Sequence, residues 1–230
     1  MTANILASAT LAAAVCLLVV DHARAEAAPP TIEQAIAEAD ARIAQAKGFA
    51  CDLQDKACLS RELVQRGEND QWIRGLLGPL CGYRSECRLY SVVAAIDAPN
   101  ARRADQVLRV HGWPAGPGWA PEVEDAIFHI VNHMPHDNPQ ITNWRPLVLP
   151  DVRRSAEAGR LPGALYAKMY DRLETQAGRP QRYGTQSYCA LTEGEPNCRL
   201  LQLEQPAQVN ALRAELGMEP LSAEEIASAQ

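Results

Sequence analysis

Six of the seven cysteines fall into three closely spaced pairs, and this pattern constrains the fold more than any other feature. The seventh, Cys16, lies in the apolar N-terminal run that we expect to be cleaved off. The pairs are Cys51 with Cys58, Cys81 with Cys87, and Cys189 with Cys198. An even number of cysteines at short spacings is typical of disulfides formed in an oxidising compartment. We therefore expect three local disulfides, and the first requires a looped segment, because seven helical residues would separate the two Cα atoms by about 10 Å. A zinc site is the alternative, but the chain contains no Cys-x-x-Cys pair.

The N-terminal segment has the layout of a secretory signal peptide. Residues 5–20 are predominantly apolar, and the small-x-small triplet Ala23, Arg24 and Ala25 follows them. A run of roughly 16 residues is shorter than the about 20 that a membrane-spanning helix needs. We expect cleavage after Ala25, removal of residues 1–25 and export to the periplasm or the medium. An uncleaved anchor is the alternative, because no Lys or Arg precedes the apolar run.

The charge of the chain argues against nucleic-acid binding. The formal net charge is -6, and it is unchanged by cleavage because Asp21 and Arg24 leave together. A mildly acidic chain without a Lys/Arg block lacks the charge that neutralises phosphates. No later apolar run reaches membrane length, so we expect no membrane contact after cleavage. The sequence points to no cofactor and to no particular oligomeric state.

Helical periodicity dominates the remaining chain and predicts a mainly α (α+β) fold. We expect one helical domain over 70–220 with a small C-terminal β-hairpin near 182–203, from strands at 182–191 and 197–203. A helical extension over 26–69 should precede it, and a tail helix over 221–230 should follow. Capping boxes mark the helix starts at Thr31 and Ser222. Further helices are expected at 59–65, 72–77, 86–96, 97–111, from 121, up to 159, at 164–177 and at 206–217. The helix at 72–77 should be capped by Asp70 and stopped by Gly78 and Pro79.

The densest polar cluster is the sequence QRYGTQ at residues 181–186. It combines two amides, a guanidinium, a phenol and a hydroxyl around a glycine, and such groups bind carboxylates, phosphates or sugar hydroxyls. The candidate ligand-binding residues are Gln140, Gln181, Arg182, Tyr183, Thr185 and Gln186. The alternative is a structural turn in which Gly184 supplies the bend and the side chains are used internally.

A second cluster contains His129, His133 and His136, followed by Asp137. Two histidines one helical turn apart can hold a metal ion. No glutamate stands where a His-Glu-x-x-His motif needs it, so we predict no metal site. A single histidine acting as an acid or base suits neutral pH, and a histidine hydrogen-bonded at the edge of the core is the structural alternative.

The pattern of polar residues resembles a bacterial family of domains of unknown function. The resemblance spans roughly residues 70–220 and is most specific at QRYGTQ. The matching residues are Asp70, Gln71, Arg74, Asp97, Asn100, Gly112, Trp113, Pro114, His133, Gln140, Asp171, Arg172, QRYGTQ, Asn210, Arg213 and Gly217. The family carries His133 but not His129 or His136, which argues further against a metal. It has no established activity, so the resemblance implies a set of positions without a reaction.

Two functional hypotheses follow. In the first, the exported domain binds a small polar or anionic ligand, or a cell-envelope component, at a pocket around QRYGTQ and His133. In the second, it is a hydrolase-type enzyme in which His133 is the general base, Asp171 orients it, and Arg172 or Arg182 stabilises negative charge. Both are strongest if His133, Asp171 and Arg172 meet QRYGTQ in one pocket.

Overall fold

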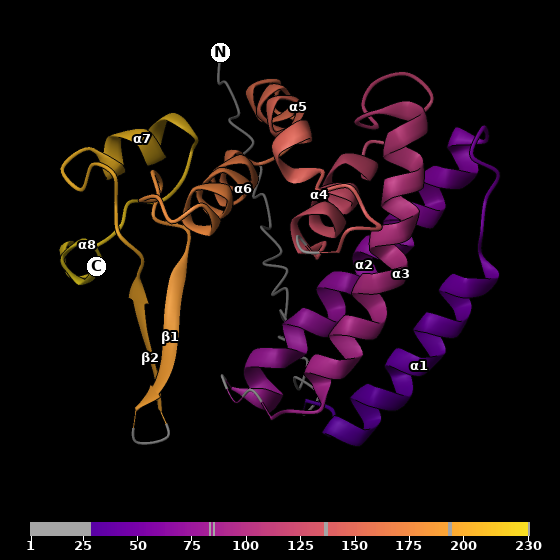
Figure 1. Ribbon diagram of the computed structural model, residues 1–230, viewed down its shortest axis with the longest axis horizontal. Coiled ribbons are helices and arrows are strands. Elements are labelled where there is room, and N and C mark those ends of the chain that lie inside the picture. The colour runs from indigo at the N-terminus through magenta and orange to yellow at the C-terminus, as the bar shows by residue number, and fades with distance from the viewer. Residues whose placement is uncertain (1–28, 83, 85, 136–137, 193–194, 230) are drawn as a thin grey trace, which may run out of the picture.

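The protein is mainly helical with one two-stranded antiparallel sheet near its C-terminus, which confirms the predicted fold class (Figure 1). The structure is a computed structural model that describes residues 29–229 except 83, 85, 136–137 and 193–194. The expected signal segment lies outside these residues. The elements are α1 (Ile32–Gly48), α2 (Lys56–Cys81), α3 (Leu89–His111), α4 (Val123–His133), α5 (Arg145–Glu157), α6 (Gly163–Gln176), β1 (Ser187–Thr192), β2 (Glu195–Leu200), α7 (Val209–Glu215) and α8 (Ala223–Ser228). Within the described chain, none of the helices is both long enough and apolar enough to cross a membrane.

Helices α2, α3 and α4 form the centre of the molecule, and α5 packs against α6 beside them (Figure 1). The side chains that fill the main core include Leu59 and Leu63 from α2, Leu108 from α3, and Ile127 and Phe128 from α4. All five are almost fully buried. Burying such a side chain stabilises the fold by about 1.5–3 kcal/mol. This core therefore fixes the positions of the three helices that carry most of the site.

Helix α1 covers a second, smaller core against α2 and α3. Its buried positions are the small residues Ala35 and Ala39, which allow the helices to approach closely around Ile73 and Ile96. The predicted capping box at Thr31 is present, because its hydroxyl accepts a hydrogen bond from the Gln34 amide. The predicted capping box at the start of α8 is also present.

Helix α2 is one continuous helix, although the sequence predicted separate helices over 59–65 and 72–77. That prediction was wrong because Asp70 does not cap a helix. Asp70 is an interior residue of α2, and its side chain contacts His133 of α4. The expected stop at Gly78 and Pro79 falls in the last turn, and the helix ends at Cys81.

Helix α3 is likewise continuous where two helices were expected, over 86–96 and 97–111. Asp97 does not start a new helix, because its carboxylate accepts hydrogen bonds from Arg74 Nη2 at 3.1 and 2.8 Å. Pro99 lies inside the helix and removes one backbone hydrogen bond, a loss of about 3 kcal/mol in an isolated helix. Apolar side chains before and after this proline are buried in the two cores, and this packing holds the helix together.

The three predicted disulfides are present. The Cα atoms are 5.7 Å apart in Cys51–Cys58, 5.6 Å apart in Cys81–Cys87 and 4.0 Å apart in Cys189–Cys198. The first bridge forms because residues 51–55 are not helical, as the spacing required. Each bridge closes a short local segment, and none joins distant parts of the chain.

The hairpin is shorter than expected, since β1 begins at Ser187 and not at residue 182. Strand β1 pairs antiparallel with β2, with Cys189 opposite Cys198. Residues 181–186 form a compact turn before the hairpin. Figure 1 shows the two strands extending away from the helical body, beside α7 and α8.

Helices α2 and α4 approach each other closely at Gly67. A Cβ atom at this position would lie 2.7 Å from the Ala126 Cβ and 2.8 Å from its Cα. Real Cβ atoms do not approach so closely, so the two helices can meet here only because residue 67 has no side chain. This contact sets the separation of Asp70 on α2 from His133 on α4.

We expect Gly67→Ala to destabilise the protein by about 1–3 kcal/mol, because the added methyl group overpacks the α2–α4 interface. Gly75→Ala is the matched control on the same helix, since nothing lies within 4 Å of the new methyl group. It should stabilise the protein by about 0.5–1 kcal/mol through helix propensity. Urea unfolding of both variants measures the two effects, and a gain of stability in both would contradict the close contact.

Candidate functional site

The candidate site is centred on a hydrogen-bonded pair, Asp70 and His133. Asp70 lies in the middle of α2, and His133 is the last residue of α4. The His133 Nδ1 atom lies 2.8 Å from Asp70 Oδ2 and 3.0 Å from Oδ1. A carboxylate only accepts hydrogen bonds, so Nδ1 carries the proton and Nε2 is the basic atom of the neutral ring. Asp70 is buried, whereas the His133 side chain keeps 15% of its exposure.

Asp70 is surrounded by donors from its own helix as well as from α4. The Gln71 amide donates to Oδ2 at 2.7 Å, and Arg74 Nη1 lies 3.3 Å from Oδ1. Burial by itself raises the pKa of Asp70, but His133, Arg74 and Gln71 together lower this pKa below its usual value. Asp70 is therefore ionised at neutral pH.

Arg74 continues this network to α3, where its guanidinium pairs with Asp97 at 2.8 Å. Burial raises the pKa of the Asp97 carboxyl above its ordinary value, and Arg74 opposes this only in part. One arginine thus joins two carboxylates with opposite pKa shifts. The network ties α2, α3 and α4 together around His133.

Two further arginines hold the C-terminal end of α4. Arg172 Nη1 donates to the Asn132 carbonyl at 2.7 Å, and Arg145 Nε donates to the same carbonyl at 3.3 Å. Arg145 Nη2 also donates to the Met134 carbonyl. The last carbonyls of a helix have no partners within the helix and carry a partial negative charge, so guanidinium groups are favourable there.

Burial lowers the pKa of Arg145 to about 10, and the neighbouring charge of Arg172 adds to this effect. Burial also lowers the pKa of Arg172, with a contribution from Arg74. Three cationic side chains therefore lie within electrostatic reach of one another. The carboxylates of this network, Asp70 and Asp97, both contact Arg74, whereas Arg145 and Arg172 bind backbone carbonyls.

Unpaired polar atoms are concentrated around His133. Four buried side-chain atoms in the described part of the chain lack a hydrogen-bond partner. Three of them are Arg74 Nη1, Asn132 Oδ1 and Arg145 Nη1, which all belong to residues of this site; Arg74 Nη1 has only the ion-pair contact with Asp70. Buried polar groups are normally satisfied, and each exception needs an explanation, such as a catalytic role or a bound water or ion.

The sequence QRYGTQ is organised by Asp171 of α6. The buried Asp171 carboxylate accepts hydrogen bonds from the backbone N–H groups of Arg182, Tyr183 and Thr185, and from the Thr185 hydroxyl. Burial raises the pKa of Asp171, and these hydrogen bonds act in the opposite direction. Gly184 has φ 66° and makes the bend.

The side chains of QRYGTQ are also largely engaged within the protein. The Gln181 amide donates to the carbonyls of Gln186 and Leu201 and accepts from the Gln186 N–H. Arg182 pairs with Glu204 at 2.8 Å and lies over the Tyr170 ring. This arrangement has the geometry of a structural turn.

The structure brings some of the predicted site residues together and separates others. His133 and Arg172 meet at the end of α4, because Arg172 binds the carbonyl of the residue before His133. The carboxylate that contacts His133 is Asp70, whereas Asp171 faces QRYGTQ. Gln140 is exposed. Helix α6 thus separates two centres, with Arg172 directed to one and Asp171 to the other.

The histidine neighbours of His133 are only partly described. The rings of His129 and His133 stack with their centroids 6.3 Å apart. His136 and Asp137 lie outside the described residues. Among the residues that are described, no three His, Cys, Asp or Glu side chains are arranged to hold a metal ion.

Sequence reasoning gave no functional role to Asp70, Arg74 or Arg145, and it treated Asp70 only as a helix cap. The first two are among the residues of the family resemblance, and their i, i+4 spacing on one helix was a usable signal. Arg145 carries no such signal, since it precedes Pro146 outside any motif. Only the folded structure shows that it reaches α4.

A groove of about 310 Å³ between α2 and α4 adjoins the pair. It is lined by Val64, Gly67, Glu68, Gln71, Glu122, Asp125, Ala126 and His129. Gln71 hydrogen-bonds Asp70, and His129 stacks on His133. The groove therefore gives solvent and small molecules a route to the neighbourhood of the pair.

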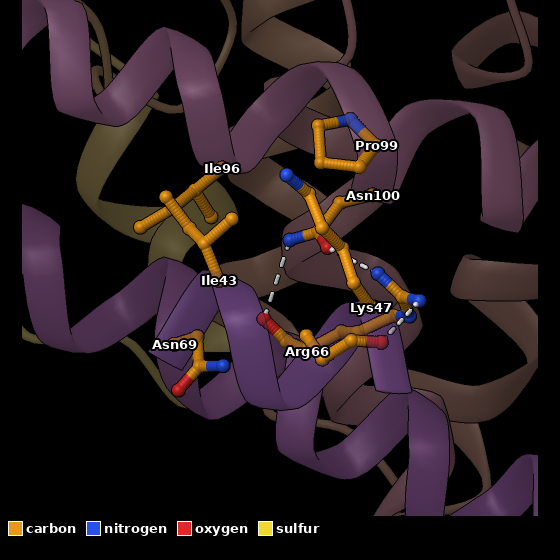
Figure 2. Close-up of a pocket in the computed structure, with 8 residues that line it drawn as sticks. Ile43, Lys47, Arg66, Asn69, Ile96, Pro99 and Asn100 are labelled. Atoms are coloured by element: carbon orange, nitrogen blue, oxygen red, sulfur yellow. Dashed lines mark hydrogen bonds between the residues drawn. The ribbon is translucent and has the colours of Figure 1, made fainter. Parts of the chain in front are cut away.

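Other cavities lie away from His133. One of about 420 Å³ is lined in part by Trp119 and Arg160. Figure 2 shows a smaller one, between α1, α2 and α3, where Arg66 and Asn100 hydrogen-bond each other beside Ile43 and Ile96. Its volume of about 40 Å³ suits a few water molecules and no organic ligand. Another cavity, of about 310 Å³, is lined in part by Arg182 and Tyr183.

The fold and the site define a mainly helical, disulfide-bonded domain with a buried Asp–His pair beside three arginines. The chain belongs to a family of unknown function, DUF6624, whose sequence model matches residues 57–227. This confirms the resemblance to a domain family of unknown function. No curated protein and no solved structure matches the chain.

Replacing either Asp70 or Asp97 with asparagine distinguishes the contributions of these two carboxyls, which share Arg74, to the pH dependence of stability. The lowered pKa of Asp70 means that its ionisation stabilises the fold above the unfolded pKa of about 3.9, and this contribution is lost as pH falls through the folded pKa. The raised pKa of Asp97 means that its ionisation opposes folding, and this cost disappears on acidification.

Between about pH 6 and about pH 3, the stability of the wild type relative to Asp70→Asn should therefore decrease. Over the same range, its stability relative to Asp97→Asn should increase. Urea unfolding of the three proteins at each pH gives both differences. Differences that change in the same direction would contradict this description of the network.

We expect Asp171→Asn to lower the free energy of unfolding by about 2–4 kcal/mol. The amide retains one acceptor oxygen and places an NH₂ group against the N–H donors of QRYGTQ. Arg182→Gln is the control, because the half-exposed ion pair that it removes contributes under about 1 kcal/mol. Equal small losses in urea unfolding would show that Asp171 does not organise the turn.

Proposed function

We propose that this protein binds a small polar ligand at the Asp70–His133 pair, with His133 Nε2 as the contacting atom. The observation that carries the proposal is the hydrogen bond from Nδ1 to a buried, ionised Asp70. This bond fixes the ring orientation and leaves Nε2 free to accept a proton or a hydrogen bond. A hydroxyl or amide N–H group of the ligand is the matching hydrogen-bond donor.

The arrangement of neighbouring groups supports a binding role. The His133 side chain is partly exposed, the α2–α4 groove adjoins it, and Arg172 lies at the same end of α4. The disulfides are compatible with an exported protein, so a cell-envelope component fits as the source of the ligand.

QRYGTQ contributes to this function through α6. By binding Asp171, it fixes the helix on which Arg172 lies. Direct ligand contacts from Gln181, Thr185 and Gln186 would require breaking internal hydrogen bonds. Contacts from Arg182 and Tyr183 remain a prediction, and the cavity that these two residues line is where they would occur.

The second candidate function is hydrolysis, and the Asp–His geometry favours it. In that reaction His133 Nε2 takes a proton from a water molecule, and the water oxygen bonds to an acyl or phosphoryl centre. The leaving group departs with the proton returned by His133, while Arg172 offsets the negative charge that develops. Asp70 would orient the imidazole, the role that the sequence assigned to Asp171.

Diethyl pyrocarbonate, which acylates unprotonated imidazole nitrogens, tests whether Nε2 can be reached. We expect His133 to react in the folded protein, and Asp70→Asn to change its rate at least several-fold because the ring loses its orienting partner. His111 is the internal reference, since its Nε2 donates to the Leu53 carbonyl at 2.6 Å and leaves Nδ1 as the nitrogen that can react. Peptide mass spectrometry measures each site. An unreactive His133 would rule out the proposed contact.

The same variants distinguish binding from hydrolysis. With p-nitrophenyl acetate as the substrate, a hydrolase should lose about 100-fold or more of its rate in His133→Gln. His111→Gln should keep the wild-type rate. Reactive His133 without any turnover that depends on it favours binding alone.

A further inference from the structure

The end of α4 holds more positive charge than its structural role requires. Arg145 and Arg172 both donate to the Asn132 carbonyl. Neither has a carboxylate partner among the residues that the structure describes. A single guanidinium is enough to satisfy a helix end, and two beside each other repel.

The neighbouring carboxylates are already engaged. Asp70 and Asp97 share Arg74, and Asp171 accepts the donors of QRYGTQ. Burial lowers the pKa of both Arg145 and Arg172, and a neighbouring cation adds to this effect in each case, Arg172 for Arg145 and Arg74 for Arg172; this is the cost of holding buried cations without an anion. A bound anion would remove this cost.

The unpaired atoms specify the kind of anion. Arg145 is 2% exposed and its Nη1 has no acceptor, while Asn132 is 5% exposed and its Oδ1 has no donor. A carboxylate supplies acceptors only. A phosphate that keeps one hydroxyl supplies acceptors for the arginines and a donor for Asn132.

Arg172 is the more accessible of the two arginines. Arg172 is partly exposed and uses only Nη1 in the hydrogen bonds described, so its other nitrogens are available to a ligand. Arg145 binds the same carbonyl and is almost fully buried. In this arrangement Arg172 contacts the ligand and Arg145 acts as a positioning residue that supplies charge.

We propose that Arg172, Arg145 and Asn132 form an oxyanion site beside His133, and that the ligand of this protein carries a phosphate group there. The link to His133 rests on the proposed function, whereas the oxyanion site itself does not. The site assigns a substrate class to the pair, namely a phosphorylated molecule with a polar group that reaches His133 Nε2.

Calorimetric titration of the disulfide-bonded protein with inorganic phosphate, at an ionic strength held constant with NaCl, tests the proposal. We expect saturable binding in the wild type, weakened about tenfold or more in Arg172→Gln. Arg172→Lys should bind with intermediate affinity, because it keeps the charge and loses the planar fork. Acetate should bind more weakly than phosphate.

Arg154→Gln is the matched control, since it removes one exposed arginine of α5 and should change the phosphate affinity by no more than about twofold. His133→Gln should retain phosphate binding within about threefold. If it does so while His133 proves unreactive, the oxyanion site stands and the proposed function fails.

Three results would overturn the oxyanion site. The first is the absence of phosphate binding in the wild type, and the second is an equal loss of binding in Arg154→Gln and Arg172→Gln. The third is phosphate binding that appears only in Asp137→Asn. That result would show that a carboxylate outside the described residues already neutralises the arginines.

Discussion

The rest of this structure depends on the hydrogen bonds and the ion pair that the buried Asp70 carboxylate makes. An isolated buried carboxylate costs several kcal/mol, so it is tolerated only with donors on all sides. Gln71 and Arg74 come from its own helix, and His133 comes from α4. Arg74 is in turn held by Asp97 of α3. Three helices therefore have to meet in one arrangement, and Gly67 permits the necessary approach.

Local features of this fold were predictable from the sequence because neighbouring residues decide them. The capping boxes at Thr31 and Ser222 and the three disulfides each depend on residues fewer than ten positions apart. The continuity of α2 and α3 was not predictable in this way. Asp70 and Asp97 have the local appearance of helix caps, and only their long-range partners show that their carboxylates are used elsewhere.

The site shows the same limit. His133 and Arg172 were identified from residue type and from the resemblance, and they do meet at the end of α4. The partner of His133 is 63 positions away in the sequence, and no periodicity connects the two residues. The role of Arg145 could not be predicted for a related reason. It depends on a hydrogen bond to the Asn132 carbonyl, which the sequence around residue 145 does not indicate.

The two polar centres that meet at α6, QRYGTQ with Asp171 and the end of α4 with Arg172, are coupled through the orientation of this helix. Adjacent positions on a helix point about 100° apart, so Asp171 and Arg172 cannot face the same pocket. Asp171 is fixed by the backbone of QRYGTQ, and this fixes the rotation of α6 about its axis. The rotation in turn directs Arg172 to the end of α4. Both centres lie within residues 57–227, whereas α1 lies outside the family match. A turn motif whose donors are used internally can therefore be specific to a family without touching a ligand, because it determines where the arginine of the site is placed.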